Sequence, residues 1–381
     1  MRIVQFTTDN REQQSNHDNP APHFGTAPEA LLEGFSSLPD VEVHVISCVR
    51  REVSIPDRIF GNIRYHPVLV PKYGWMSTLY SGCVRATSRL VRDLAPDVVH
   101  GQGTERDCAM NAAHSGVPNV VTIHGNMAEL NRLGETFQDA RMYGFLASRL
   151  ETHALRKTGG VFCNSAYTES LVAPRARHTW RVPNAIRKAF FRDRGDASVA
   201  EVPQLLNVGL ISPRKRQLEL LREAARINAK GDEFQIAFAG TIPNSQYGRV
   251  FAEELRQAEK EGYAFHAGFL DVDGLIRLMD RSHGMIHCPT EEAFGLVVAE
   301  GMARGLKFFG SDLGGIRDIA AGIHGAELHQ GLGQLMDGVS RWLSGGAPKP
   351  GAAKDQIAER YHPGVVAARH VEIYEELLRK Q

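Results

Sequence analysis

The sequence PTEEAFGLVVAEGMARG occupies positions 289–305 and directly follows an apolar, strand-like run at positions 283–288. Its polar and acidic opening predicts a loop, and the stretch that follows predicts a helix whose start contains Gly295. Glu292 in the loop and Glu300 within the helix would then lie roughly 10 Å apart, at about 1.5 Å per helical residue. One small ligand at the helix N-terminus could contact both glutamates, and the N–H groups there favour an anion. Two solvated glutamates on an ordinary strand–loop–helix unit would give the same pattern.

The length of the chain, 381 residues, is too great for one ordinary hydrophobic core and predicts two domains. Hydrophobic residues make up 43% of the sequence and charged residues 23%, which is usual for a globular protein. The formal net charge of zero argues against a nucleic-acid partner and against a polybasic membrane anchor. Any contact with a membrane is therefore expected to be peripheral at most.

The five cysteines, at positions 48, 83, 108, 163 and 288, are scattered and form no C-x-x-C motif. This spacing does not favour a zinc site or a disulfide framework, and we interpret the cysteines that lie in apolar runs as core thiols. The N-terminal sequence MRIVQF enters a strand directly and lacks the apolar segment of a signal peptide. No apolar run reaches the length of about 18 residues that a transmembrane helix needs. We therefore expect a cytoplasmic protein.

Short apolar strands alternate with amphipathic helices along the whole chain, which predicts an α/β architecture with parallel sheets. The expected strands lie at 2–7, 41–48, 62–70, 97–101, 119–124, 160–164 and 178–182 in the first half, and at 204–211, 234–240, 263–269, 284–288 and 306–311 in the second. A charged stretch without periodicity at 187–202 marks a domain boundary. We therefore expect one domain over 1–186, a second over 187–362, and a C-terminal amphipathic helix over 363–381.

Two further strand ends have the composition of binding loops. The strand VVTIH at 120–124 ends at His124, and open α/β sheets place ligands at such carboxyl ends. The sequence NVGLISPRKRQ at 207–217 follows a strand and opens a helix. Its three successive basic residues, Arg214, Lys215 and Arg216, lie where a helix dipole disfavours cations, so they predict a bound anion.

A long polar loop at positions 9–25 follows the first expected strand and ends at Gly25. The T-x-x-E sequence from Thr26 to Glu29 predicts a capping box at the start of a helix. A helix N-terminus preceded by glycine can approach a phosphate or a sugar closely. An ordinary capped surface loop explains the same residues without a ligand.

Taken in order along the chain, these stretches resemble the retaining glycosyltransferases of family GT4, which have the GT-B fold. The pair Glu292 and Glu300 resembles the E-x7-E signature of that family. Other matching segments are PDVVHGQ at 96–102, VTIHG at 121–125, VGLISPRKR at 208–216 and SDLGGIRD at 311–318. Leu210 stands where the family has an arginine, and either Arg214 or Arg216 could supply the missing charge.

The resemblance implies two Rossmann-like domains facing across a cleft, with the donor nucleotide held mainly by the second. It implies that Glu292 binds donor-sugar hydroxyls, that Lys215 stabilises the leaving diphosphate, and that His124 contacts an outer hydroxyl of the sugar. Glu300 would hold the ribose hydroxyls. The residues implied in donor binding are Gly25, Gly209, Arg214, Arg216, Phe294, Gly295, Leu296 and Glu300. No cofactor and no metal ion is implied.

The implied reaction is the metal-independent transfer of a hexosyl group from a UDP- or GDP-linked sugar to an acceptor hydroxyl, with retained anomeric configuration. The partners would be the nucleotide sugar and an acceptor, which could be a saccharide, a lipid-linked molecule or a small molecule. Two alternatives stay open at this point. One is a GT-B sugar-nucleotide epimerase, which would act without an acceptor, and the other is a non-catalytic sugar-nucleotide-binding protein.

Overall fold

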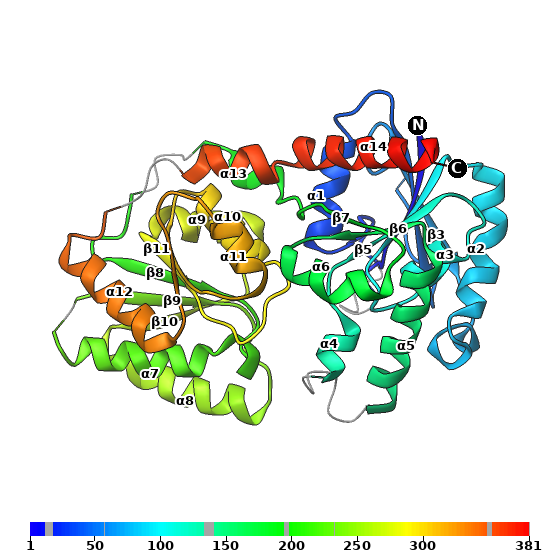
Figure 1. The fold of residues 1–381 in the computed structure, drawn as a ribbon. Helices are drawn as coiled ribbons and strands as arrows, with labels where there is room; N and C mark the ends of the chain where they lie inside the picture. The colour runs from blue at the N-terminus through cyan, green and yellow to red at the C-terminus, as the bar shows by residue number, and fades with distance from the viewer. Residues whose placement is uncertain are drawn as a thin grey trace. The chain divides into compact units, whose positions relative to one another are not determined.

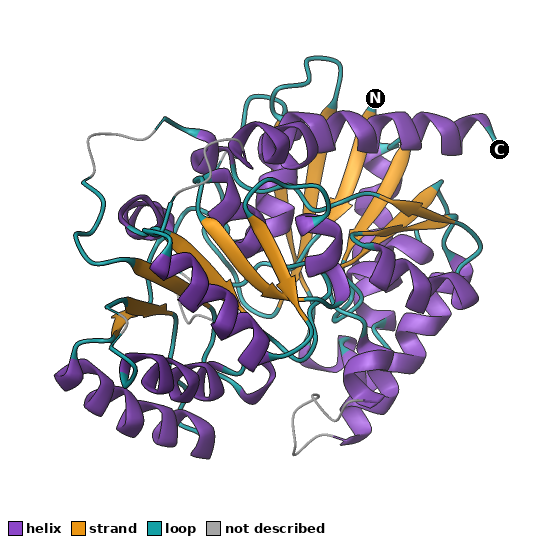
Figure 2. Ribbon diagram, turned by 60° about the vertical axis from the view of Figure 1, so that its left-hand side comes forward, coloured by secondary structure: helices purple, strands orange, loops and turns teal. Residues whose placement is uncertain are grey.

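The computed structural model describes residues 1–11, 18–56, 58–132, 141–193, 198–231, 233–348 and 353–380. Contacts within the chain divide it into two compact units. The first consists of Met1–Arg187 together with Tyr361–Gln381, and the second of Lys188–Arg360. Figure 2 shows that each unit combines helices with a sheet.

The first unit is built on a parallel sheet of seven strands in the order β3-β2-β1-β4-β5-β6-β7. The strands are β1 (Arg2–Phe6), β2 (Glu42–Val49), β3 (Ile63–Leu69), β4 (Val98–Gln102), β5 (Asn119–Ile123), β6 (Gly160–Cys163) and β7 (Thr179–Arg181). Val4 in β1 pairs with His44 on one side and with Val99 on the other. The central strands are buried on both faces, as their continuous apolar runs predict.

Helices cover both faces of this sheet. They are α1 (Thr26–Phe35), α2 (Ser81–Leu94), α3 (Cys108–Ala113), α4 (Met127–Arg132), α5 (Arg141–Lys157), α6 (Ala166–Val172) and the C-terminal α14 (Pro363–Arg379). Apolar side chains of α1 and α14 form one core with the sheet, whereas α2, α3 and α5 contribute to a second core. Figure 1 shows α14 in red beside α1 in dark blue.

The second unit contains a parallel sheet of six strands in the order β10-β9-β8-β11-β12-β13. Its strands are β8 (Gln204–Val208), β9 (Gln235–Ala239), β10 (Ala264–Gly268), β11 (Gly284–His287), β12 (Lys307–Ser311) and β13 (Ala326–His329). The sequence did not predict β13. It is an edge strand with the sequence AELH and only intermediate burial, so it lacks the apolar run that marks the other strands.

The helices of the second unit also form two layers. They are α7 (Gln217–Asn228), α8 (Gln246–Glu261), α9 (Val272–Arg281), α10 (Leu296–Ala303), α11 (Gly314–Ala320), α12 (Leu332–Ser344) and α13 (Ala353–Tyr361). Side chains of α7, α8 and α12 share one core with the sheet, and Figure 1 shows α9, α10 and α11 on its other face. The predicted architecture of two parallel-sheet α/β domains is thus confirmed. None of the described helices is both long and apolar enough to span a membrane.

The packing of α14 on α1 depends on a close approach of two backbones at Gly34. A Cβ atom at this position would lie 2.2 Å from the carbonyl oxygen of Pro363 and 2.7 Å from the Cβ of Ala367. Tyr374 lies about two turns further along α14 than Ala367, and its hydroxyl contacts His100 Nδ1 at 2.6 Å. The C-terminal helix is therefore part of the hydrophobic core of the first unit.

We predict that Gly34→Ala lowers the free energy of unfolding by about 1–3 kcal/mol, because the added methyl group cannot fit without moving α14. Gly333→Ala in α12 is the matched control, since a Cβ there meets no atom within 4 Å. That variant should be unchanged or gain about 0.5–1 kcal/mol from its higher helix propensity. Urea unfolding monitored by circular dichroism measures both, and equal stability of the two variants would contradict the packing described.

Candidate active site

The candidate donor site lies at the carboxyl edge of the second sheet, where the strand order changes direction. β8 and β11 are neighbours there, and the chain continues from β8 to β9 on one side and from β11 to β12 on the other. Open parallel sheets bind ligands at such a point, because the two outgoing loops diverge and leave room between them. The loops that leave these strands, at 209–216 and 288–295, carry most of the predicted donor-site residues.

The loop after β8 is held by its own side chains. A short 3-10 helix, Pro213–Lys215, begins at Ser212, whose hydroxyl accepts the backbone N–H of Lys215 at 3.4 Å. Gln217 accepts the N–H of Ser212 at 3.1 Å and donates to the carbonyl of Leu210 at 3.1 Å. These contacts leave Leu210, at the position of the family's arginine, with its side chain 56% exposed.

The two loops meet in a contact among Lys215, Glu292 and His287. Lys215 Nζ forms an ion pair with Glu292 Oε2, and His287 Nε2 lies 3.1 Å from the same oxygen. The side chains of Lys215 and Glu292 are only 15% and 13% exposed. The structure thus brings together two of the three residues predicted to be catalytic and adds His287, which the sequence did not single out.

The electrostatics of this cluster determine the charge of each group. Burial by itself would raise the pKa of Glu292, but the hydrogen bond with His287 and the charge of Lys215 outweigh it, so the pKa lies well below its usual range. Burial lowers the pKa of His287, and the charge of Lys215 lowers it further. His287 is therefore neutral, and its Nε2 carries the proton donated to Glu292. With this lowered pKa, Glu292 is ionised at neutral pH, so it can accept hydrogen bonds but is unsuited to act as a general acid.

A second ion pair joins the same loops. Arg214 donates to the carboxylate of Glu291 at 3.0 Å and to its carbonyl oxygen at 3.2 Å, while the N–H of Thr290 donates to the carbonyl of Arg214 at 2.8 Å. Burial raises the pKa of Glu291 despite the charge of Arg214. Arg216 instead takes a left-handed conformation, φ 57°, at the N-cap of α7. Arg214 is therefore the arginine that is tied to the loop containing Glu292.

The start of α10 supplies backbone N–H groups next to this cluster. Gly295 is its N-cap, with φ 98°, a conformation that glycine adopts without strain, and Leu296 is its first residue. Phe294 is buried. Gly315 at the start of α11 donates its N–H to the carbonyl of Glu292 at 2.9 Å, and a Cβ there would lie 2.3 Å from the carbonyl oxygen of Ala293. The paired glycines 314 and 315 thus allow α11 to support the loop directly.

Glu300 lies in the second turn of α10 and is 5% exposed. Gly209 adjoins the Lys215 side chain, whose Cε would be 3.9 Å from a Cβ at that position. The strand end at Gly209 also packs against Gly240, where a Cβ would lie 2.1 Å from the carbonyl oxygen of Gly209. The roles of Glu300 and Gly209 in donor binding stay predictions.

His124 belongs to the first unit and follows β5. Its Nε2 lies 2.9 Å from Gln102 Oε1, which can only accept a hydrogen bond, so Nε2 carries the proton. Burial lowers the pKa of His124 to about 4, so the imidazole is neutral at pH 7. The next residue, Gly125, donates its N–H to Glu105 at 2.7 Å. The sequence did not identify Gln102 as the residue that orients His124, and the catalytic role of His124 stays a prediction.

Gly25, the predicted donor contact in the first unit, is the N-cap of α1 with φ 87°. The predicted capping box is wrong, because Thr26 is the first helical residue and no side chain caps the helix. Glu29 accepts the N–H of Phe24 at 3.0 Å instead, and Thr26 accepts from Arg187 at 2.8 Å. Positions 12–17 of the preceding polar loop lie outside the described residues.

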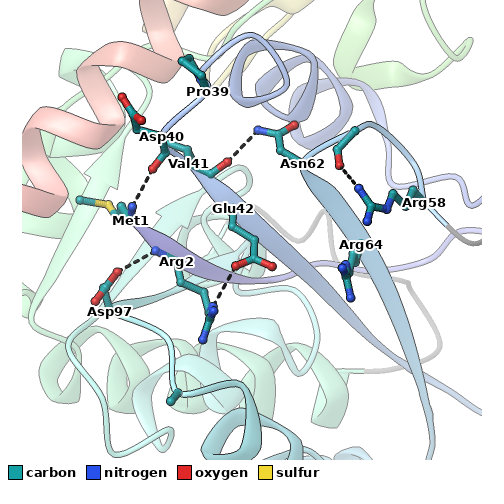
Figure 3. A pocket seen from close by; sticks show the side chains of 12 residues that line it. Met1, Arg2, Pro39, Asp40, Val41, Glu42, Arg58, Asn62, Arg64 and Asp97 are labelled. Atoms are coloured by element: carbon teal, nitrogen blue, oxygen red, sulfur yellow. Dashed lines mark hydrogen bonds and ion pairs between the residues drawn. The ribbon is translucent and has the colours of Figure 1, made fainter.

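A cavity of about 550 Å³ lies at the opposite, amino edge of the first sheet (Figure 3). Its polar groups bind one another: the amino group of Met1 donates to the carbonyl of Asp40 at 2.6 Å, and Arg2 pairs with Glu42 at 3.0 Å. The lining residues are Met1, Arg2, Pro39, Asp40, Val41, Glu42, Arg58, Gly61, Asn62, Arg64, Ala95 and Asp97. Because parallel sheets bind ligands at the other edge, we assign this cavity no ligand.

Two family models match the chain. One, described as Glycosyltransferase Family 4, covers residues 30–189, and the other, described as Glycosyl transferases group 1, covers residues 192–346. This chain belongs to the GT4-type glycosyltransferases of the GT-B fold. Among curated proteins, none matches the chain in sequence.

Solved structures support the GT-B fold of this glycosyltransferase over its whole length. Sucrose-phosphate synthase (tll1590) from Thermosynechococcus elongatus aligns with 16% identity and a TM-score of 0.75, covering 100% of both chains. Anabaena Alr3699/HepE in complex with UDP and glucose aligns with 16% identity and a TM-score of 0.72, covering 99% of this chain and 100% of that one. The lipopolysaccharide outer core galactosyltransferase WaaB aligns with 15% identity and a TM-score of 0.68, again covering 99% and 100%.

We predict that Glu292→Gln lowers the free energy of unfolding by about 2–3 kcal/mol at pH 7, because it leaves Lys215 without its counter-charge. The pKa of Glu292 is depressed in the folded protein, so the wild type should lose this advantage as the pH falls below 4.5, the ordinary pKa of the carboxyl. Urea unfolding at several pH values measures the difference, which should shrink toward acid pH.

The matched control is Glu254→Gln, which breaks an exposed ion pair with Arg222 in the same unit. Exposed pairs contribute little, so its effect should stay within about 0.5 kcal/mol. Equal effects of the two variants at pH 7 would contradict the electrostatic description of the Glu292 cluster.

Proposed function

We propose that this GT4-type enzyme transfers a hexosyl group from a UDP- or GDP-linked sugar to an acceptor hydroxyl, with retention of the anomeric configuration. The observation that carries the proposal is the cluster of Lys215, Glu292 and His287 beside the start of α10, at the switch point of the second sheet. The cluster places a fixed cation, a fixed carboxylate and a helix N-terminus at the edge where a parallel sheet binds ligands.

In this proposal Lys215 and Arg214 balance the negative charge that grows on the leaving diphosphate, and no metal ion is assigned. Both cations are held by carboxylates, Glu292 and Glu291, so they are positioned before the donor binds. Preorganised charges of this kind stabilise a transition state more effectively than mobile ones. The N–H groups at Gly295 and Leu296 would contribute to the same diphosphate, as helix N-termini do at phosphate sites.

Glu292 would accept hydrogen bonds from donor-sugar hydroxyls, since its neighbours hold the pKa of its carboxyl well below the usual range. The bond between the anomeric carbon and the phosphate oxygen breaks, and a bond from that carbon to the acceptor oxygen forms on the same face. The acceptor proton passes to the leaving phosphate oxygen, so Glu292 does not serve as nucleophile or base. His124 would contact an outer hydroxyl of the donor sugar, as the family resemblance implies.

We predict that Lys215→Ala lowers kcat/KM for transfer by about 10²–10³-fold, the usual effect of removing one group that stabilises transition-state charge. Lys307→Ala is the matched control, because Lys307 is equally shielded at 13% exposure and pairs with Glu327 in the same unit. Transfer from a UDP- or GDP-sugar to an acceptor measures both variants. Near-normal turnover by Lys215→Ala would exclude the diphosphate role of Lys215.

We predict that Glu300→Gln weakens binding of the nucleoside diphosphate by about 10–100-fold, the range for one lost hydrogen bond to a charged group. Calorimetry with the ribose and 2′-deoxyribose forms of the same nucleotide makes the test specific. The wild type should prefer the ribose form, and the variant should lose that preference. A variant that keeps it would exclude Glu300 as the ribose ligand.

The donor can be identified by a thermal-shift screen of UDP- and GDP-linked sugars, since a ligand bound only by the folded protein raises its melting temperature. The positive donor is then incubated with and without an acceptor panel. Transfer to an acceptor supports the proposal. An epimer formed from the donor alone would favour a sugar-nucleotide epimerase, and binding without any turnover would favour a non-catalytic protein.

A further inference from the structure

Cys48, Cys83 and Asp107 form a cluster in the interior of the first unit. Their two Sγ atoms and a carboxylate oxygen lie within 4.8 Å of one another. In the part of the chain that the structure describes, this is the one group of three or more Cys, His, Asp or Glu side chains with such geometry. Their exposed fractions are 7%, 0% and 4%, so the cluster is shielded from solvent.

Three separate elements bring these residues together. Cys48 lies near the carboxyl end of β2, Cys83 lies in the first turn of α2, and Asp107 directly precedes α3. Asp107 occupies the N-cap position of α3, but its side chain caps no backbone N–H. It accepts a hydrogen bond from Asn111 Nδ2 at 2.8 Å, and the same nitrogen lies 3.6 Å from Cys48 Sγ.

The direct hydrogen-bond partners of the cluster are neutral groups, since Asp107 accepts from Asn111 and Cys83 donates to the carbonyl of Gly74. Within the described residues Asp107 forms no ion pair, although a buried carboxylate is costly unless a cation or several donors accompany it. Asn111, 2% exposed, has a buried Oδ1 atom without any hydrogen-bond partner. A divalent cation between the three side chains would resolve both features, because it supplies positive charge and accepts a further oxygen ligand.

We propose that Cys48, Cys83 and Asp107 bind a Zn²⁺ ion, with Asn111 Oδ1 as the fourth ligand. Zinc binds thiolates at about 2.3 Å and carboxylate oxygens at about 2.1 Å in a tetrahedron, so two of its ligand atoms lie roughly 3.4–3.8 Å apart. The three ligand atoms here lie within 4.8 Å of one another, so each would shift by at most about 1 Å to bind one ion. A half turn of the Asn111 amide exchanges atoms of similar size and directs Oδ1 to the ion, so two bonds to zinc would replace the hydrogen bond from Asn111 to Asp107.

Binding is balanced in charge and protons. The two thiols and the carboxyl release their protons to solvent, and no electron is transferred. Two thiolates and one carboxylate carry three negative charges, one more than Zn²⁺ neutralises. The positive charge of the neighbouring Arg106, which acts on Asp107, offsets the remaining negative charge. The Arg106 guanidinium is itself held over the Trp75 ring at 5.1 Å. The ion would tie β2, α2 and α3 together and so stabilise the first unit.

A disulfide between Cys48 and Cys83 would explain less of the structure. It would use the two thiols but leave Asp107 and Asn111 Oδ1 without new partners. The thiolate–carboxylate set is instead typical of zinc rather than of the hard cations that prefer oxygen ligands alone. The zinc site does not depend on the donor-site proposal, because its residues lie in the other unit.

The test titrates Co²⁺ into the full-length, reduced, metal-stripped protein and follows thiolate-to-metal charge-transfer absorption. We expect about one Co²⁺ per chain, displaced by Zn²⁺, and a Zn²⁺-dependent rise in melting temperature. Cys48→Ala and Cys83→Ala should lose the absorption. Cys108→Ala and Cys163→Ala are matched controls, because both thiols are buried in the same unit outside the cluster, and they should retain it.

Asp107→Asn keeps the side-chain shape and should weaken Co²⁺ binding at least tenfold. This variant replaces the cysteine variants as the test if one of them fails to fold. The proposal is overturned if the reduced wild type shows no thiolate-bound Co²⁺, or if the Cys48 and Cys83 variants bind as the wild type does. A Cys48–Cys83 disulfide in the purified protein, together with no metal binding after reduction, would equally overturn it.

Discussion

The ion pair between Lys215 and Glu292 is the interaction on which the candidate donor site depends. It joins the loops that leave two neighbouring strands, β8 and β11, and His287 at the end of β11 donates to the same carboxylate. Two charges at such low exposure would be costly if either were alone, since each has lost most of its hydration. Their mutual attraction and the hydrogen bond therefore determine where both loops lie relative to the start of α10.

The same pair of loops contains the position at which this chain departs from the family motif. An arginine expected at position 210 is replaced by an exposed leucine, and Arg214 lies in the adjacent turn, bound to Glu291. The two ion pairs are Arg214 with Glu291 and Lys215 with Glu292. The two cations are consecutive on one loop, and the two carboxylates are consecutive on the other. These ion pairs offset the positive charge at the start of the helix, and in the proposed function the same cations would bind the donor diphosphate.

Part of the site could be read from local sequence, and part could not. The E-x7-E pair, the basic loop and the glycines 295 and 315 have local signatures, because a loop, a cation cluster and a tight approach each require particular residues in succession. His287, Glu291 and Gln102 had none, although His287 stands out as the polar end of an apolar strand. The partner of Glu291 is 77 residues away and that of Gln102 is 22 residues away, so only the strand order reveals them. His287 lies only five residues from Glu292, but the two meet only because the loop folds back onto the end of the strand. Cys48, Cys83 and Asp107 are likewise scattered in sequence and adjacent only in the fold.

By itself the sequence determined the alternation of strands and helices, the two-domain α/β architecture and the family, because these follow from hydrophobic periodicity and from short motifs. It missed the edge strand β13 and misplaced the cap of α1, where a long-range contact from Arg187 overrides a local capping pattern. Only the tertiary structure shows that Arg214 pairs with Glu291, that burial and neighbouring groups lower the pKa of Glu292, and that ligand atoms of Cys48, Cys83 and Asp107 lie within 4.8 Å of one another. Charge state and coordination depend on burial and on neighbours brought together by parallel strand order, which no local stretch of sequence specifies.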